Sequence, residues 1–188
     1  MTEVAEHPPL SGGTTMSELL QQYPGAQRAL FARYHIGGCR SCGFRPDETV
    51  AEVCARNENL PVEEVIAHVQ ETHDADAKLQ IPPQELVELR AAHPALKVLD
   101  VRTREEHEAA VIPGSQLMSQ ELMQEIFGSW SKTDPIVIYD HDGSRALDAA
   151  AYFIGHGFSE TKCLAGGIDA YSMDVDATIP RYRIEFGD

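Results

Sequence analysis

The sequence of 188 residues has little cysteine and little positive charge. Four cysteines are too few for a protein of this length that is held together by disulfides. Lysine and arginine number 15 against 30 acidic residues, which gives a net charge of −15, and neither half of the chain is basic. Because an acidic surface repels phosphate backbones and anionic lipids, we expect no nucleic-acid partner and no membrane partner.

Long apolar runs are also missing. No run approaches the roughly 20 residues that span a bilayer. The first residues, MTEVAEHPPLSGG, contain neither a basic segment nor an apolar segment, so they do not resemble a signal peptide. These absences predict a cytoplasmic protein.

The sequence divides into two regions with different residue patterns. Residues 1–13 show no periodicity and are predicted to be a disordered tail. Residues 14–73 carry helical signals throughout, which predict four short helices. Thr15 and Glu18 form a capping-box pattern before the first helix, and Asp47 is the expected cap of the third. Residues 74–80 interrupt this pattern and are predicted to be a linker.

From residue 81 to residue 188, apolar runs alternate with helical patterns. LKVLDV and PIVIYD are typical of buried strands, and SRALDAAAYFIGHG is typical of a helix that ends at a glycine. This alternation predicts a mostly parallel sheet that is covered on both faces. The predicted fold is therefore a two-domain protein, with a small four-helix domain followed by an α/β domain.

One loop of the α/β domain is suited to bind an anion. Ligands of open α/β sheets bind beyond the carboxyl ends of the strands, and residues 140–145 follow the second predicted strand directly. A tight strand-to-helix loop can point several backbone N–H groups at an anion. The candidate residues are Asp140, His141, Asp142, Gly143, Ser144 and Arg145, with Arg145 expected to close the site.

The stretch from about Ile81 to Tyr182 resembles a single rhodanese domain. It is similar to that family in the motifs LDVR, EEHEAAVIPGS, the loop that ends in Arg145, and LAGGIDAY followed by IPRY, in this order. The resemblance implies a rhodanese fold. It also implies that sulfane sulfur is carried as a persulfide on a cysteine at the first position of the loop.

That first position is Asp140 in this sequence, and the loop contains no cysteine. A sulfur carrier needs a polarisable thiolate, and a carboxylate cannot form a persulfide. We therefore predict that the domain is not a thiosulfate sulfurtransferase. The Asp140 side chain is expected to occupy the anion site itself, with its pKa lowered by the N–H donors and by Arg145.

The same loop also fits a second pattern. IVIYDHDGS matches the strand followed by DxDGS of haloacid-dehalogenase-type phosphatases, in which the first aspartate is a nucleophile. That motif normally opens the catalytic core, yet the residues after Asp140 supply no clear later lysine and acidic-pair motifs. The phosphatase-like site is therefore a remote alternative.

Other polar residues of this domain favour structural roles. Asp100 and Arg102 are expected to form an ion pair under the loop. Cys163 is expected to be buried in a short apolar strand. His107 and His141 show no metal-ligand spacing with a second histidine or cysteine.

The helical domain carries a CxxC motif, at Cys39 and Cys42. The spacing brings two sulfur atoms within reach of one disulfide or one metal ion, and the glycines before it permit a tight turn. We predict a reversible, accessible disulfide, while Cys54 lies on an apolar helix face and remains unreactive. The competing hypothesis is that Cys54 pairs with Cys39 or Cys42 in a three-thiol exchange site. Persulfide formation and a metal site stay open, because His35 and Cys54 would complete four ligands if they converged.

Residues 14–69 resemble the small helical domain named for hybrid-cluster proteins and a redox disulfide, through MSELLQQYP, LFARYHIGGCRSCGF and ETVAEVCARNENL. The resemblance implies thiol–disulfide chemistry at Cys39, Cys42 and Cys54. Two hypotheses follow: a rhodanese-like binding or regulatory module coupled to a redox pair, or an enzyme that transfers sulfur or disulfides through Cys39 and Cys42. We expect no cofactor, and an unidentified protein, a small thiol or an anion as partner.

Overall fold

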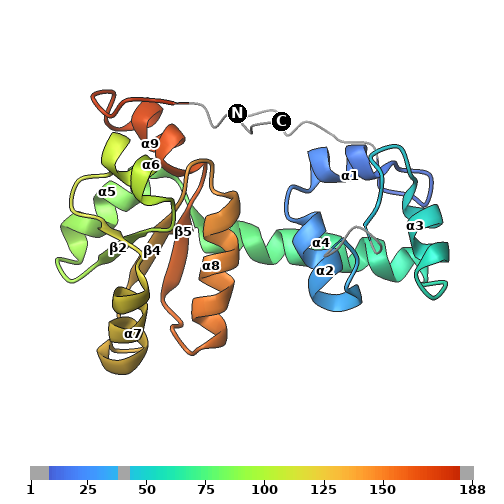
Figure 1. Cartoon of the computed structure of the whole chain (residues 1–188), viewed down its shortest axis with the longest axis horizontal. Helices are drawn as coiled ribbons and strands as arrows, with labels where there is room; N and C mark the ends of the chain where they lie inside the picture. The colour runs from blue at the N-terminus through green and yellow to red at the C-terminus, as the bar shows by residue number, and fades with distance from the viewer. Residues whose placement is uncertain (1–8, 38–42, 183–188) are drawn as a thin grey trace. The chain divides into compact units, whose positions relative to one another are not determined.

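The structure is a computed structural model that describes residues 9–37 and 43–182. The chain divides into two compact units between Ala77 and Lys78. The helices of the first unit are α1 (Met16–Gln22), α2 (Ala26–Tyr34), α3 (Val50–Arg56) and α4 (Val62–Leu79), and the last turn of α4 crosses the boundary (Figure 1). None of the described helices is long and apolar enough to cross a membrane.

Two capping boxes begin α1 and α3. The predicted box at Thr15 is confirmed: its hydroxyl accepts the N–H of Glu18, and the Glu18 carboxylate accepts the N–H of Thr15. The prediction that Asp47 caps α3 is wrong, because Thr49 and Glu52 form an equivalent box there. A β-bridge joins Thr15 to Thr49, so the two helix starts lie side by side.

The apolar faces of the helices of the first unit pack together and form its core. Cys54 is 2% exposed and belongs to this core, as its position on an apolar face predicts. Its buried companions are Met16, Leu19, Ala26, Ala29, Leu30, Ile36, Val50, Val53, Val65 and Val69.

The predicted linker differs from the structure. Residues 74–79 continue α4 as regular helix, and residues 80–81 already form the first strand of the sheet. The polar composition of this stretch suggested a break, but alanine, lysine and leucine are good helix formers. Asp76 is also buried and forms an ion pair with Arg28 of α2, which anchors the helix there.

The second unit is built on a parallel sheet with the strand order β1-β5-β4-β2-β3. Figure 1 labels the three central strands, β5, β4 and β2. The strands are β1 (Gln80–Ile81), β2 (Lys97–Asp100), β3 (Gln116–Leu117), β4 (Ile136–Tyr139) and β5 (Thr161–Leu164). The helices are α5 (Pro83–Ala92), α6 (Arg104–Ala109), α7 (Gln120–Ser129), α8 (Ser144–Gly155) and α9 (Gly167–Asp174). The predicted α/β domain with a parallel sheet is confirmed.

Helices cover both faces of the sheet. Successive side chains of a strand point to opposite faces, so neighbouring residues of one strand belong to different clusters. On one face, Val137 and Tyr139 pack in the cluster that holds residues of α5 and α9. On the other face, Ile136 and Ile138 pack with residues of α7 and α8. Cys163 lies in this second cluster and is 0% exposed, which confirms the expected buried position.

Candidate functional site

The predicted anion-binding loop lies at the carboxyl edge of the sheet, between β4 and α8. Asp140 follows the last residue of β4, and its side chain is 0% exposed. One carboxylate oxygen, Oδ1, accepts the N–H of Gly143 at 2.6 Å, and Oδ2 accepts the N–H of Arg145 at 2.8 Å. The two inward N–H groups of the loop are therefore bound by the chain's own carboxylate.

A close backbone contact holds this loop in place. The carbonyls of Asp140 and His141 accept the N–H groups of Ile168 and Asp169 at the start of α9, at 2.9 and 3.1 Å. Gly167 makes the contact possible, because a Cβ atom there would lie 2.5 Å from the carbonyl oxygens of Asp140 and His141. Gly167 also has a positive φ of 57°, which favours glycine.

The pKa of Asp140 departs from the prediction. Burial raises the pKa of this carboxyl above its ordinary value, and the N–H donors of Arg145 and Gly143 only partly offset burial. The nearby Asp142 carboxylate raises it further. The prediction of a lowered pKa is wrong because the sequence could not show that the side chain would be fully buried.

Arg145 does not close the loop by a hydrogen bond. Its Nε lies 3.9 Å from Asp140 Oδ2, and its terminal nitrogen lies 3.6 Å from Oε1 of Glu106 on α6. The side chain is 50% exposed. Arg145 is therefore shared between two carboxylates at ion-pair distance. The other loop carboxylate, Asp142, is bound locally, since its Oδ1 accepts the N–H of Ser144 at 3.0 Å.

The geometry also bears on the phosphatase-like alternative. A nucleophilic aspartate must present an oxygen to the substrate. Both oxygens of Asp140 are engaged by backbone N–H groups, and the side chain has no exposed surface. In this arrangement Asp140 therefore presents no exposed oxygen that could attack a substrate.

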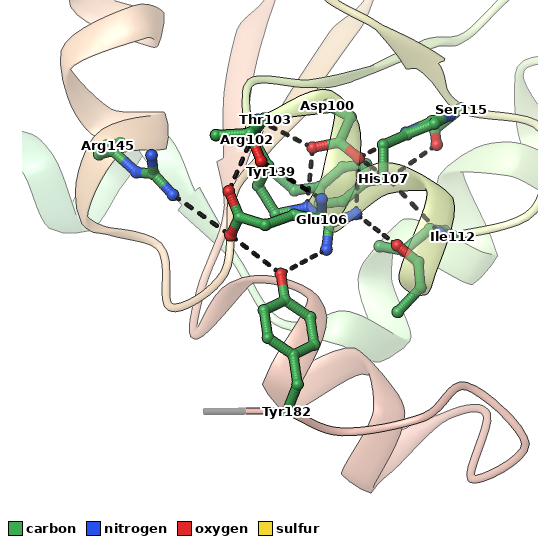
Figure 2. Close-up of polar contacts among 11 residues, drawn as sticks. Asp100, Arg102, Thr103, Glu106, His107, Ile112, Ser115, Tyr139, Arg145 and Tyr182 are labelled. Atoms are coloured by element: carbon green, nitrogen blue, oxygen red, sulfur yellow. Dashed lines mark hydrogen bonds and ion pairs between the residues drawn. The ribbon is translucent and has the colours of Figure 1, made fainter. Parts of the chain in front are cut away.

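A second carboxylate, Asp100 at the end of β2, lies at the centre of a buried polar network (Figure 2). Arg102 donates to both of its oxygens, at 2.9 and 2.6 Å, and the side chains of both residues are 0% exposed. Nδ1 of His107 lies 2.7 Å from Asp100 Oδ2, and the hydroxyl of Tyr139 donates to the same oxygen at 2.9 Å. The predicted Asp100–Arg102 ion pair is confirmed.

Asp100 and Arg102 each stabilise the ionised form of the other. Although burial acts against its ionised form, hydrogen bonds from Arg102 and His107 lower the pKa of Asp100. Burial also opposes the charge of Arg102, but hydrogen bonds with Asp100 and Tyr182 raise its pKa. Burial and the Asp100 charge raise the pKa of Tyr139 to about 12.

Tyr182 joins the two parts of the site (Figure 2). Its hydroxyl accepts from Arg102 at 2.7 Å and donates to Glu106 at 3.0 Å. The Tyr182 ring packs on His141 of the loop, with ring centres 4.6 Å apart. His141 Nδ1 is shielded from solvent and has no hydrogen-bond partner within residues 9–37 and 43–182.

Several of these residues were missed by sequence reasoning. Glu106 was detectable, because it forms a capping box with Thr103 of the same kind as the predicted one. Tyr182 ends the IPRY motif of the resemblance, but its partners lie 76 and 80 residues earlier in the chain, so the sequence did not show its role. His107 was judged by metal spacing alone, whereas its partner is a carboxylate seven residues away.

The CxxC motif, for which a redox disulfide is predicted, lies outside the described residues, since residues 38–42 include both Cys39 and Cys42. His35 is the C-cap residue directly after α2; its backbone is left-handed and the residue is exposed. Burial raises the pKa of the Cys54 thiol, as predicted for an unreactive cysteine. Among the residues that the structure describes, no group of three or more His, Cys, Asp and Glu side chains is placed to hold a metal ion.

Comparison with known proteins agrees with the fold of the second unit. A family model of the rhodanese-like domain matches residues 82–174. Thiosulfate sulfurtransferase GlpE of Pseudomonas putida is 27% identical over 98 residues, which cover 52% of this chain and 88% of GlpE. Adenylyltransferase and sulfurtransferase UBA4 of Lodderomyces elongisporus is 27% identical over 177 residues, 85% of this chain but only 38% of UBA4.

A third relative, the chloroplastic rhodanese-like/PpiC domain-containing protein 12 of Arabidopsis thaliana, is 34% identical over 94 residues. The alignment covers 46% of this chain and 30% of that protein. The residues matched by the family model, 82–174, include strands β2 to β5 and the loop at residues 140–145. The chain therefore contains a rhodanese-like domain, at residues 82–174.

Proposed function

We propose that the rhodanese-like domain of this chain does not transfer sulfane sulfur and serves as a binding or regulatory module, coupled to a thiol-redox pair at Cys39 and Cys42. The observation that carries this proposal is the Asp140 carboxylate, which is fully buried and takes up both inward N–H groups of the loop. By the resemblance, position 140 is where the family carries its sulfur-binding cysteine.

No other thiol of the second unit can replace a cysteine at this position. Cys163 is the single cysteine after residue 77, and it lies on β5 with no exposed surface. A sulfur carrier must reach its donor and its acceptor, so an inaccessible thiol is inert. Thiol chemistry in this chain is therefore assigned to the first unit.

The second candidate function is sulfur or disulfide transfer by Cys39 and Cys42. It is favoured by the relatives, two of which are named as sulfurtransferases, and by the alignment with one of them over 85% of this chain. In this case the rhodanese-like domain would be a scaffold or docking platform. Mass spectrometry of the protein with and without reductant would reveal a disulfide, a persulfide sulfur or neither.

Transfer of sulfur from thiosulfate to cyanide distinguishes the two candidates. The wild type is compared with the double variant Cys39→Ser/Cys42→Ser. The proposal predicts no turnover above the protein-free rate for either protein. Turnover that is lost in the double variant would establish the second candidate, and turnover that survives in it would overturn the proposed loss of activity in the rhodanese-like domain.

A further inference from the structure

Three side chains of the second unit hold Tyr182, and each of them contacts a different part of its phenol group. Figure 2 shows the hydroxyl between two of them: Nη1 of Arg102 donates to it at 2.7 Å, and it donates to Oε1 of Glu106 at 3.0 Å. The ring packs on His141, with ring centres 4.6 Å apart and an angle of 44° between the ring planes. We call Arg102, Glu106 and His141 the tyrosine socket.

Other contacts of the unit fix the donor of the socket. The Arg102 side chain is 0% exposed. Its Nε and Nη2 donate to Asp100, and Nη2 also donates to the carbonyl of Ala110. Among the described residues, Tyr182 supplies the acceptor for Nη1. A buried donor without an acceptor is costly, so Nη1 requires an oxygen atom where the Tyr182 hydroxyl lies.

The acceptor of the socket is fixed in a similar way. Oε2 of Glu106 accepts the N–H of Thr103 at 3.0 Å, in the capping box that begins α6. Oε1 lies 3.6 Å from Arg145, and the Glu106 side chain is only 16% exposed. The socket therefore has one donor and one acceptor whose positions do not depend on Tyr182.

The chemistry of the socket selects a phenol. A hydroxyl both accepts and donates, so it satisfies Arg102 and Glu106 together. An aliphatic alcohol has no ring to pack on His141, and a phenylalanine ring leaves both polar groups without a partner. The Glu106 carboxylate repels a second carboxylate or a phosphate. The ligand that satisfies all three side chains is a tyrosine side chain.

Tyr182 lies on a segment that is weakly attached beyond Ile179. Ile179 is buried in the core, and its carbonyl accepts the hydroxyl of Ser172 at 2.7 Å. Arg181 forms an ion pair with Asp169, but the arginine side chain is 53% exposed, and exposed ion pairs contribute little to stability. Tyr182 can therefore leave the socket while Ile179 stays in the core.

We propose that the socket is a binding site for a tyrosine side chain of a partner protein, and that Tyr182 is its intramolecular competitor. A partner's tyrosine makes the same three contacts in place of Tyr182. The tethered Tyr182 has a high effective concentration at the socket, so a partner needs further contacts to displace it. Because His141 belongs to the loop at residues 140–145, the exchange also changes what covers that loop.

This inference rests on the proposed function, because it names the partner class of the binding module. A different protein is favoured over a second copy of this chain as the partner. Each copy carries a net charge of −15, and this charge opposes the approach of two copies.

The test uses the full chain with Tyr182→Ala, which empties the socket. The probes are N-acetyltyrosinamide and N-acetylphenylalaninamide, and the amide NMR signals of Arg102, Glu106 and His141 are followed during each titration. We expect saturable shifts with the tyrosine probe and binding about tenfold weaker or less with the phenylalanine probe, because it lacks the hydroxyl that a buried donor requires. No saturable shift with the tyrosine probe, or equal binding of the two probes, would overturn the socket.

Comparison with the wild type tests the role of Tyr182 as competitor. The wild type should bind the tyrosine probe more weakly than Tyr182→Ala, because the tethered tyrosine competes with it. Tyr182→Phe keeps the ring and loses the hydroxyl, so its affinity should lie between the two. Should Tyr182→Ala not fold, tighter binding by Tyr182→Phe than by the wild type supports the competition. Equal affinity of the wild type and of the folded variants would overturn it.

A second tyrosine provides the matched control. Tyr152→Ala removes a ring that is 50% exposed and whose hydroxyl makes no hydrogen bond to any described residue. This variant should bind the tyrosine probe no better than the wild type does. A gain in affinity equal to that of Tyr182→Ala would overturn the assignment of binding to the socket.

The outcomes are separate from those of the sulfur-transfer assay. If the tyrosine probe does not bind and the protein shows no turnover of thiosulfate, this inference fails and the proposed function remains. If the probe binds but the rhodanese-like domain transfers sulfur, the proposed function fails and the socket remains. A wild-type dimer in sedimentation that Tyr182→Ala dissociates would overturn the choice of a different protein as partner.

Discussion

Two carboxylates at the same edge of the sheet show opposite electrostatic behaviour. Asp100 ends β2 and Asp140 directly follows the neighbouring strand β4, and both side chains are 0% exposed. Yet the pKa of Asp100 is lowered, whereas the pKa of Asp140 is raised. The two residues share their burial, so the difference lies in their partners.

Asp100 is bound by a buried guanidinium that contacts both of its oxygens. Asp140 is bound by two backbone N–H groups, and the nearest guanidinium is half exposed and 3.9 Å away. A buried full charge offsets the loss of solvation of a carboxylate, while two amide dipoles do so only in part. At this edge of the sheet, Asp100 therefore has a stabilised ionised form, whereas the ionised form of Asp140 is destabilised.

The largest expected difference between the two carboxylates is in how much the free energy of unfolding falls when the arginine beside each one is replaced. Arg102→Met leaves Asp100 buried without its cation, and we expect a loss of about 3–5 kcal/mol in the free energy of unfolding. Arg145→Met is the matched control and should cost less than about 1 kcal/mol, because that side chain is half exposed. Urea unfolding followed by the fluorescence of Trp130, the single tryptophan, reports on this unit. Similar losses for both variants would contradict the comparison.

The pH dependence of stability should have opposite signs for the two carboxylates. The raised pKa of Asp140 means that its contribution grows as the pH falls from 7 towards the ordinary value of 3.8. The lowered pKa of Asp100 means that its contribution is complete above 3.8 and is lost as the pH falls through its folded pKa.

The measurement compares the wild type with Asp140→Asn and with Asp100→Asn in urea between about pH 3 and pH 7. The advantage of the wild type over Asp140→Asn should widen as the pH falls. Its advantage over Asp100→Asn should stay constant to about pH 4 and narrow below it. A trend of the same sign for both variants would refute the assignment.

Tyr182 links the Asp100 network to the loop, and its removal should have the smallest effect. Tyr182→Phe deletes two hydrogen bonds, to Arg102 and Glu106, at a half-buried position. We expect a loss of about 1 kcal/mol in the free energy of unfolding. Tyr152→Phe is the control, because that ring is 50% exposed and its hydroxyl makes no hydrogen bond to any described residue. A loss no larger than that of the control would show that Tyr182 does not join the two parts.

The features that the sequence predicted are those that depend on neighbouring residues. The alternation of apolar runs and helices predicted the parallel sheet, and Thr15 with Glu18 predicted a capping box. The predicted Asp100–Arg102 pair joins residues that are two positions apart. All of these depend on short stretches of chain.

The features that could not be predicted depend on tertiary structure. The raised pKa of Asp140 follows from its burial. The loop that buries it packs against Gly167, which lies 27 residues later. The role of Tyr182 depends on contacts with α6, which the chain order does not show. The ion pair of Asp76 with Arg28, which anchors α4 at residues 74–79, joins positions that are 48 residues apart.

We propose that Asp140 occupies the anion site of its own loop, and a titration with thiosulfate examines whether that site is free. The amide NMR signals of Gly143 and Arg145 are followed during a thiosulfate titration of the wild type and of Asp140→Ala. We expect no saturable shift in the wild type and a saturable shift in the variant, in which the carboxylate that accepts these two N–H groups is absent. Saturable binding to these two amides in the wild type would contradict it.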